Sequence, residues 1–265
     1  MASIDFEALG NEQKKYESIS AGVRLIPGVP VIARLDGRAF HTLTKHANKP
    51  FDEALIRSMM FVTSKLVEEF NAEIGYQQSD EITLVWKSLD MFDGKVQKMV
   101  SVLASYATAV FIKAVDENKF LYHVEFPTFD CRIWQVASLE IAADNLMWRE
   151  WDATKNSISM CAHHIFSDNM LKSVSSKDRL EMLYQHGYDW TELPDYKKRG
   201  SYWQKRCFME FLSEEQLEKI PAQHRPAGTV SRNRVVMLEM PRLTQISNKV
   251  EVLFKGGTPV YENHI

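Results

Sequence analysis

The sequence contains few cysteines, and their spacing excludes two common kinds of cysteine site. Cys131, Cys161 and Cys207 are the three cysteines among 265 residues, and no two of them form a Cys-x-x-Cys pair. An odd number of widely spaced cysteines argues against a disulfide framework and against a zinc site. Free thiols fit a reducing compartment, so we expect a cytoplasmic protein.

Segments that would direct the chain to a membrane are also missing from the sequence. The N-terminus has no basic region followed by an apolar one, and no apolar run approaches the length of a membrane span. We therefore expect neither a signal peptide nor a transmembrane helix, and no membrane partner. Internal repeats and low-complexity tracts are absent as well.

A surplus of positive charge is missing too. The formal net charge is −3 and the pI is about 6.3, whereas a nucleic-acid-binding domain usually shows a basic surplus or stripe. Any contact with RNA must therefore come from local clusters of basic residues, although each cluster alone is more typical of a solvated face. The clusters are Lys197-Lys198-Arg199 with Lys205-Arg206, where Tyr202 and Trp203 could stack on bases, and Arg225, Arg232 and Arg234.

The composition that is present, 45% hydrophobic and 25% charged, is that of a soluble protein with a sizeable core. The order strand, helix, strand, helix, strand over the first half is typical of a ferredoxin-like palm, an antiparallel sheet with helices on one face. We therefore predict an α+β fold with a palm-type catalytic domain in residues 1–135. Residues 136–265 are predicted to form a helical and irregular region that packs on the palm and contacts RNA.

Apolar periodicity and turn residues set the predicted elements. The strand over 31–35 follows a Pro-Gly turn, and Asp52 is placed to cap a helix whose apolar residues recur as far as Phe70. The other predicted elements are an amphipathic helix over 6–19 lying across the domain, strands over 81–86 and 121–129, and helices over 92–115 and 139–166.

Two acidic positions stand at the ends of predicted strands. The apolar run Val31–Leu35 ends in Asp36 and Gly37, and a second β-type run begins with Asp80 and Glu81. In phosphoryl and nucleotidyl transfer, Mg²⁺ is held by one or two carboxylates together with substrate phosphates, so Asp36 and Asp80 are candidate metal ligands. The alternative is that these positions are only a turn and a solvated strand start.

Asp80 and Glu81 are adjacent, and adjacent residues of a regular strand point to opposite faces. Only one of them would then share an ion with Asp36. We predict that Asp80 does so and that Glu81 orients the site.

Two lysines near the start of a predicted helix form a second candidate site. Lys95 and Lys98 lie one turn apart near the N-terminal end of the helix over 92–115, where backbone amides and the helix dipole favour anions. A triphosphate could dock there. The alternative is a pair of exposed lysines.

The motifs around these residues resemble a known enzyme family. The series comprises Arg34-Leu35-Asp36-Gly37-Arg38-Ala39-Phe40-His41, then Lys49-Pro50-Phe51-Asp52, then Gln78-Ser79-Asp80-Glu81. It is similar to the signature series of the tRNA-His guanylyltransferase-like family, the enzymes that add nucleotides to RNA 5′ ends in the 3′-to-5′ direction. Further similar segments follow in order from about Leu9 to Arg206: Leu9-Gly10 with Lys15-Tyr16-Glu17, Lys95-Val96-Gln97-Lys98, Phe129-Asp130-Cys131-Arg132, Trp148 to Thr154, and Tyr196 to Gly200.

The resemblance implies a two-metal nucleotidyltransferase whose site residues are assigned by position. Two Mg²⁺ ions would be held by Asp36, the backbone carbonyl of Gly37 and Asp80, with Asp36, Asp80 and Glu81 as the catalytic residues. The implied partners are GTP, ATP or another nucleoside triphosphate and the 5′ end of tRNA, and the implied assembly is a homotetramer, a dimer of dimers. The bound nucleotide would lie against Arg38, Ala39, Phe40, His41, Lys49, Asp52, Ser79, Lys95 and Lys98.

One departure from the family pattern bears on the reaction. Family members that add an extra guanosine to histidine tRNA without a template carry His-Ile-Asn-Asn in the long helix, where this sequence has Thr154-Lys155-Asn156-Ser157. This resembles the bacterial, archaeal and phage-type branch, which repairs truncated tRNA 5′ ends by template base pairing, so we predict template-dependent repair. The alternatives are non-templated guanosine addition, a nucleotide cyclase, which shares the palm and the two acids, and a non-enzymatic tRNA-binding protein.

Overall fold

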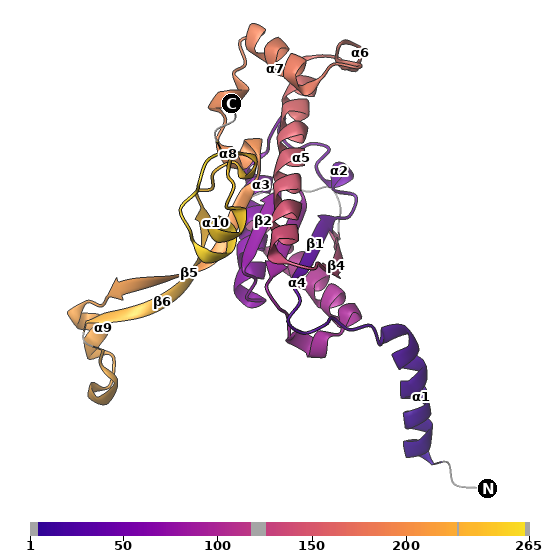
Figure 1. The fold of residues 1–265 in the computed structure, drawn as a ribbon, viewed down its shortest axis with the longest axis vertical. Helices are drawn as coiled ribbons and strands as arrows, with labels where there is room; N and C mark the ends of the chain where they lie inside the picture. Colours follow the sequence, from indigo (N-terminus) through magenta and orange to yellow (C-terminus); the bar gives the residue numbers. More distant parts are fainter. Residues whose placement is uncertain (1–4, 118–125, 227, 263–265) are drawn as a thin grey trace.

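The structure is a computed structural model that describes residues 5–117, 126–226 and 228–262. Its centre is a six-stranded antiparallel sheet (Figure 1). Its strands are β1 (Val31–Gly37), β2 (Ile74–Gln78), β3 (Glu81–Trp86), β4 (Phe129–Gln135), β5 (Ser201–Phe211) and β6 (Thr229–Leu238). Their spatial order is β4-β1-β3-β2-β5-β6. The first four form the ferredoxin-like palm, so the predicted α+β fold is confirmed, and β5 and β6 extend the sheet beyond β2.

Helices cover both faces of this sheet. α3 (Glu53–Glu69) and α4 (Val96–Glu117) pack on the face where Val31, Ala33 and Leu35 are buried. α5 (Leu139–Ile165) packs on the opposite face against Ile32 and Val85. The remaining helices are α1 (Phe6–Ala21), α2 (Phe40–Leu43), α6 (Asp168–Leu171), α7 (Ser176–Gln185), α8 (Asp195–Lys198), α9 (Glu214–Glu218) and α10 (Lys249–Lys255), with short 3₁₀ turns η1 (Met91–Gly94), η2 (Trp190–Glu192), η3 (Ala222–His224) and η4 (Leu243–Gln245).

α3 forms as its sequence signals predict. Asp52 is the N-cap of α3, and its carboxylate accepts the backbone N–H of Leu55 at 3.0 Å. Met59, Val62 and Leu66, which recur at three or four residues, are fully buried. The predicted cap and the predicted core face are therefore confirmed.

We expected no segment long and apolar enough to span a membrane, and α4 differs from this expectation. By length and composition alone it is long and apolar enough to cross a membrane. In this fold it packs on α3 and β4, and Met99, Leu103 and Phe111 along it are fully buried. Its apolar residues therefore build the core.

Of the strand predicted over 121–129, residues 121–125 lie outside the described part of the chain, and β4 begins at Phe129.

A buried cluster of hydrogen bonds joins α5 to the C-terminal half of the chain. Arg199 donates to the Glu150 carboxylate at 3.4 Å, and the Tyr202 hydroxyl of β5 donates to the same oxygen at 2.9 Å. The backbone N–H of Leu243 donates to the second carboxylate oxygen at 3.1 Å. Residues beyond 135 therefore contact the palm through α5 and through the sheet, and the division of the chain at residue 135 stays a prediction.

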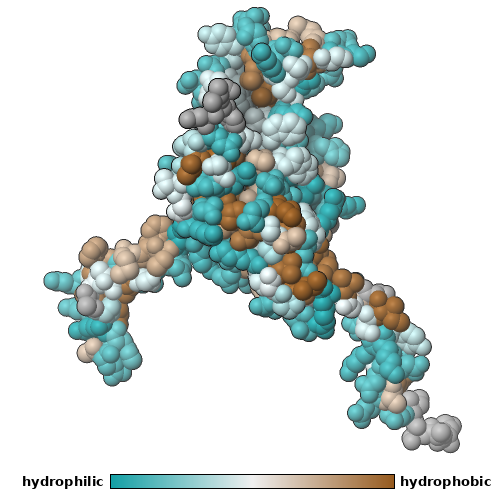
Figure 2. Space-filling model, in the orientation of Figure 1, coloured by the Kyte–Doolittle hydropathy of each residue, from teal (hydrophilic) through white to brown (hydrophobic). Residues whose placement is uncertain are grey.

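Two extensions leave the body in different directions, α1 and the hairpin of β5 and β6 with α9 near its tip (Figure 1). We predicted that the first helix lies across the domain and packs on it, but in one chain it points away from the body, so this prediction is wrong for a single chain. Apolar surface is visible on both extensions (Figure 2). The exposed apolar side chains are Phe6, Leu9, Tyr16 and Ile19 on α1, and Phe208, Met209 and Phe211 on the hairpin.

Candidate active site

The predicted acids meet where β1 ends and where β2 turns into β3. Asp36 is the direct cross-strand partner of Glu81, and Asp80 lies in the short turn just before it. The backbone N–H of Gly37 donates to the carbonyl of Asp80 at 3.1 Å, which ties the two segments together. The structure therefore brings Asp36, Gly37, Asp80 and Glu81 to one place, as the sequence predicted.

The turn after Asp36 is fixed to the hydrophobic core. A Cβ at Gly37 would lie 2.4 Å from the Phe40 ring, so no other residue fits there without displacing that ring. The Phe40 ring in turn packs against Phe111 and Phe129, with ring centroids 5.1 Å apart in each case. The structure thus favours a positioned carboxylate over a freely solvated turn.

Asp80 and Glu81 lie in an environment that disfavours the charge of their carboxylates. Burial raises the pKa of Asp80, and the nearby charge of Asp36 raises it further. Burial also raises the pKa of Glu81, although the charges of Arg149 and Arg34 lower it in part. A cation bound at Asp36 and Asp80 would offset the repulsion between them.

Glu81 is held by two arginines. Arg34 lies 2.5 Å from its carboxylate, Arg149 of α5 donates to the same oxygen, and Arg34 also lies 3.1 Å from Asp36. This pairing fits an orienting role for Glu81, which stays a prediction. The alternation argument behind it was wrong, because Asp80 lies in the turn and Glu81, directly opposite Asp36, shares its face of the sheet.

Oxygen atoms at this turn suit a hard divalent cation. The carboxylates of Asp36 and Asp80 and the carbonyl of Gly37 are ligands of the type that Mg²⁺ takes in proteins. Within the described ranges, no group of three or more His, Cys, Asp or Glu side chains is arranged to hold a metal ion. A cation here would therefore need phosphate oxygens of a substrate to complete its ligands, which is the usual arrangement in phosphoryl transfer.

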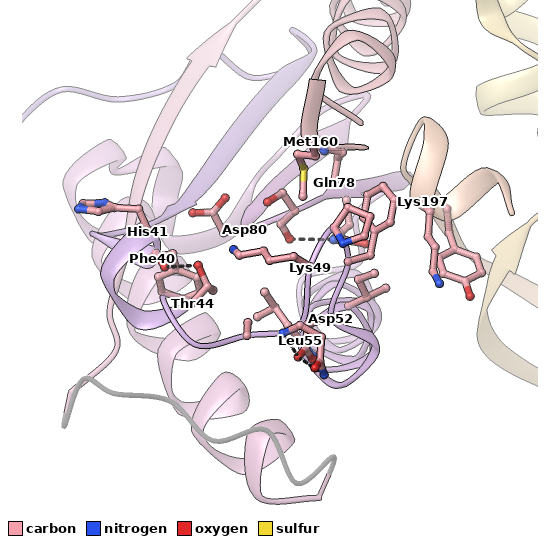
Figure 3. Close-up of a pocket in the computed structure, with 18 residues that line it drawn as sticks. Phe40, His41, Thr44, Lys49, Asp52, Leu55, Gln78, Asp80, Met160 and Lys197 are labelled. Atoms are coloured by element: carbon pink, nitrogen blue, oxygen red, sulfur yellow. Dashed lines mark hydrogen bonds between the residues drawn. The ribbon is translucent and has the colours of Figure 1, made fainter. Parts of the chain in front are cut away.

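A cavity of about 280 Å³ opens beside Asp80 (Figure 3). The side chain of Lys49 runs through it and ends near Asp80 (Figure 3). Of the carboxylates in the described part of the chain, none forms an ion pair with Lys49, so its charge is available to a ligand. Six of the predicted residues line the cavity: Phe40, His41, Lys49, Asp52, Ser79 and Asp80.

Asp52, Arg38 and Ala39 differ from the predicted role of nucleotide contacts. Asp52 lines the cavity, but its carboxylate also accepts the backbone and side-chain N–H groups of Asn48 at 2.9 and 3.0 Å. It therefore fixes the loop that carries Lys49. Arg38 and Ala39 do not line the cavity, and the backbone N–H of Arg38 donates to the Thr128 carbonyl at 2.9 Å.

A shallower groove of about 600 Å³ adjoins the cavity along α5. The two hollows share the turn 78–80 and Met160, and Arg34, Asp36 and Glu81 line only the groove. The acidic turn therefore separates a cavity from an open groove, as a site that joins two substrates requires. The residues that α5 contributes to the groove are Arg149, Asp152, Asn156, Ser159, Met160 and His163.

Lys95 and Lys98 are not brought to this site within one chain. They line a separate hollow with Glu17 and Ala21 of α1. The backbone of Lys95 forms an isolated β-bridge with the backbone of Arg24, in the segment that leads to the start of β1. Asp36 lies at the far end of that strand. The geometry of a single chain therefore does not support the prediction that they hold the triphosphate.

The sequence did not predict that Tyr196 and Lys197 lie in the cavity, and it misled about their neighbours. Tyr196 and Lys197 line the cavity, and Lys197 forms an ion pair with Glu53 of α3. In the sequence they stand out only as part of a basic stretch. In that stretch Arg199 and Tyr202 are buried, so the proposed base-stacking role of Tyr202 is wrong.

Comparison with known proteins places this geometry in one family. The family profile described as tRNAHis guanylyltransferase matches residues 10–137, which include the acidic turn and Lys49. A solved bacterial tRNA(His) guanylyltransferase-like protein in complex with ATP is 30% identical to this chain, covers 92% of it and 98% of its own length, and has a TM-score of 0.73. A similar bacterial structure in complex with GTP is 30% identical over 89% of this chain and 94% of that one, with a TM-score of 0.68.

A curated relative agrees with these structures. The tRNA(His) guanylyltransferase of Schizosaccharomyces pombe is 27% identical over 77% of this chain and 81% of the yeast protein. The matches cover the palm as well as the region beyond it. This chain belongs to the tRNA(His) guanylyltransferase family of nucleotidyltransferases.

Proposed function

We propose that this protein adds nucleotides to the 5′ end of tRNA in the 3′-to-5′ direction, as a template-dependent repair enzyme. The observation that carries the proposal is the position of the acidic turn between a cavity that holds Lys49 and a groove that opens along α5. A triphosphate in the cavity and an RNA end in the groove would meet at Asp36 and Asp80. Membership in the family and its solved relatives in complex with ATP and with GTP support this assignment.

Asp36, Asp80 and the carbonyl of Gly37 are the residues that would hold the metal, which we propose to be two Mg²⁺ ions. When bound, the ions would neutralise the phosphates and stabilise charge on the attacking and leaving oxygens. Glu81, fixed by Arg34 and Arg149, would keep the carboxylate face in position. Lys49 would add a charge-assisted contact to the triphosphate.

The reaction consistent with this arrangement has two displacements. A tRNA end with a 5′-monophosphate first attacks the α-phosphate of ATP or GTP, which releases pyrophosphate and leaves an activated end. The 3′-hydroxyl of an incoming nucleoside triphosphate then attacks the 5′ phosphorus of the RNA, which releases the activating nucleoside monophosphate. An RNA that already carries a 5′-triphosphate needs only the second displacement, with pyrophosphate as the leaving group.

The contacts of Thr154, which stands where family members with non-templated addition carry histidine, support template dependence. The Thr154 hydroxyl donates to the Glu150 carbonyl of the same helix at 2.8 Å. Thr154 lines neither the cavity nor the groove. No side chain at this position is therefore available to select guanosine regardless of the template.

The test is incorporation of each of the four nucleotides into tRNA that lacks its first 5′ residue, with the opposing base varied. We expect the Watson-Crick partner of the opposing base to be preferred in every case. Constant addition of guanosine would contradict template dependence and favour the non-templated reaction. Absence of addition to any RNA, with cyclisation of nucleotides or with RNA binding alone, would contradict the proposed activity itself.

We also propose that the chain assembles as a homotetramer. α1 and the hairpin of β5 and β6 expose apolar side chains that no described element of the same chain covers (Figure 2). Most of the stability of a helix in a protein comes from packing of its apolar face, so partners for the apolar face of α1 are expected. Light scattering of the full chain, and of a variant with Phe6 and Ile19 replaced by serine, would test the proposal; an unchanged monomeric mass for both would contradict it.

A further inference from the structure

α5 carries two half-exposed tryptophans on its outer side. Trp148 is 50% exposed and Trp151 is 47% exposed, although tryptophan is highly buried on average. The two residues are three positions apart, and Lys155 follows four positions later, so all three lie on one stripe of the helix. This stripe faces away from the buried side of α5, which includes Leu146 and Ala153.

A cation lies over each of the two rings. The guanidinium carbon of Arg149 is 4.7 Å from the Trp148 ring centroid, and Nζ of Lys155 is 4.3 Å from the Trp151 ring centroid. About half of each tryptophan side chain remains open to solvent. Aromatic surface combined with positive charge is the combination that binds single-stranded nucleic acid, because bases stack on the rings and phosphates approach the cations.

The tryptophans lie beside the groove of the candidate active site. Successive residues of an α-helix are turned by about 100° around its axis. Trp148 is therefore turned by about 100° from Arg149, and Trp151 by the same angle from Asp152. Arg149 and Asp152 line the groove next to the acidic turn. An RNA strand that leaves the groove over the edge of α5 reaches the two rings next.

We propose that Trp148 and Trp151 stack on unpaired nucleotides of the RNA acceptor end, next to the nucleotide that reacts. This inference rests on the proposed function, because it takes the reacting RNA end to lie at the acidic turn. The charge of Lys155, which forms no ion pair with any residue that the structure describes, favours RNA as the occupant over the apolar surface of a second copy of the chain, whereas Arg149 is held by Glu81 and Asp152. The stacking surface is thus on α5, whereas Tyr202 is buried and Trp203 donates its indole N–H to Ser201 at 2.9 Å.

The experiment measures binding of two labelled acceptor-stem RNAs to the full chain by fluorescence anisotropy at constant salt. One RNA has unpaired 3′ nucleotides and the other is a blunt duplex. We expect Trp148→Ala and Trp151→Ala each to raise the Kd for the RNA with unpaired nucleotides by about 5- to 150-fold. The blunt duplex should show little change, and Trp148→Phe and Trp151→Phe should retain most of the affinity because they keep an aromatic face.

Tyr184→Ala on α7, which removes another exposed aromatic side chain, is the matched control and should leave both Kd values unchanged. Equal Kd values for wild type and both alanine variants would overturn the proposal. Loss of affinity that occurs only together with a fall in molar mass by light scattering would overturn it too, since the stripe would then be a contact between copies.

Nucleotide addition by wild type is measured in parallel. If wild type adds nucleotides and the alanine variants bind RNA normally, the stacking inference fails and the proposed function stands. If the alanine variants bind the RNA with unpaired nucleotides more weakly than wild type, but wild type adds no nucleotide, the proposed function fails and the stacking surface stands.

Discussion

Asp36 and Glu81 face each other across β1 and β3, and Arg34 contacts both carboxylates, at 3.1 and 2.5 Å. Asp80 has a different environment, because in the described part of the chain no arginine or lysine forms an ion pair with it. Its pKa is raised by burial and by the charge of Asp36. Asp80 is therefore the carboxylate of this turn that gains most from a bound cation.

Asp36→Ala and Asp80→Ala should each abolish nucleotide addition while the protein stays folded. Each change removes a predicted metal ligand and leaves the apolar core intact. Asp90→Ala, which removes an exposed carboxylate of a loop, is the control and should leave the rate unchanged. Rates are measured at saturating Mg²⁺, with circular dichroism for the fold; near-normal rates in both site variants would contradict the metal assignment.

Divalent cation affinity should depend on pH in a range set by Asp80. Since its pKa is raised in the folded protein, Asp80 is protonated at a higher pH than an ordinary aspartate, and its metal ligand is lost there as pH falls. We expect calorimetry with Mg²⁺ or Mn²⁺ to show affinity that declines before the usual carboxyl range is reached. Affinity that stays constant down to that range would contradict the prediction.

The raised pKa of Asp80 affects folding stability and metal affinity in opposite directions: as pH falls, metal affinity declines, but the contribution of Asp80 to folding stability increases. A carboxyl group with a raised folded-state pKa binds its proton more tightly in the folded than in the unfolded protein. Without divalent cations, its contribution should therefore favour folding more as pH falls through the raised pKa. Denaturant unfolding of wild type and Asp80→Asn in a chelating buffer measures this contribution as the difference between their pH profiles.

The sequence predicted the palm because the patterns there are local. Asp52 caps its helix through a residue three positions away, and the alternating residues of β1 follow from the pleat of a strand. The meeting of Asp36 with Asp80 was predicted only because two strands with acids at their ends could lie side by side in one sheet. Resemblance to the family supplied most of the predicted residues that line the cavity.

What the sequence did not predict depends on long-range contacts. Arg199 and Tyr202 look like a basic and aromatic surface in the sequence, yet both are buried against Glu150. Lys95 and Lys98 have the right charge for a triphosphate but lie in another hollow. The packing of the chain beyond the palm decides these positions, and neither charge nor periodicity reports it.

Arg199→Met should destabilise the protein strongly, because it leaves the carboxylate of Glu150 buried without its charge partner. Loss of one partner of a buried ion pair costs about 3–5 kcal/mol. Lys219→Met, which breaks the exposed pair with Glu215, is the control, for which about 0–1 kcal/mol is expected. Denaturant unfolding measures both free energies, and equal values for the two variants would show that the buried cluster does not hold the C-terminal half in place.

Lys49→Ala should weaken the use of nucleoside triphosphates more than the double variant Lys95→Ala with Lys98→Ala. Lys49 ends inside the cavity near Asp80, so its loss removes a charge-assisted contact of about 1.5–3 kcal/mol (Figure 3). That corresponds to a fall of about 10- to 150-fold in kcat/KM for the nucleotide. Lys95 and Lys98 line the hollow beside α1, so the double variant should keep a nearly normal value if one chain builds the whole site.

The measurement is the dependence of the addition rate on nucleotide concentration with 5′-triphosphorylated RNA, which isolates the second displacement. A nearly normal value for Lys49→Ala would remove this lysine from the triphosphate site. A large loss in the double variant would mean that Lys95 and Lys98 reach a nucleotide after all. Since the two lysines are remote from Asp36 within one chain, they would then have to act on the site of a second copy, and mixing the double variant with Asp36→Ala should restore part of the activity.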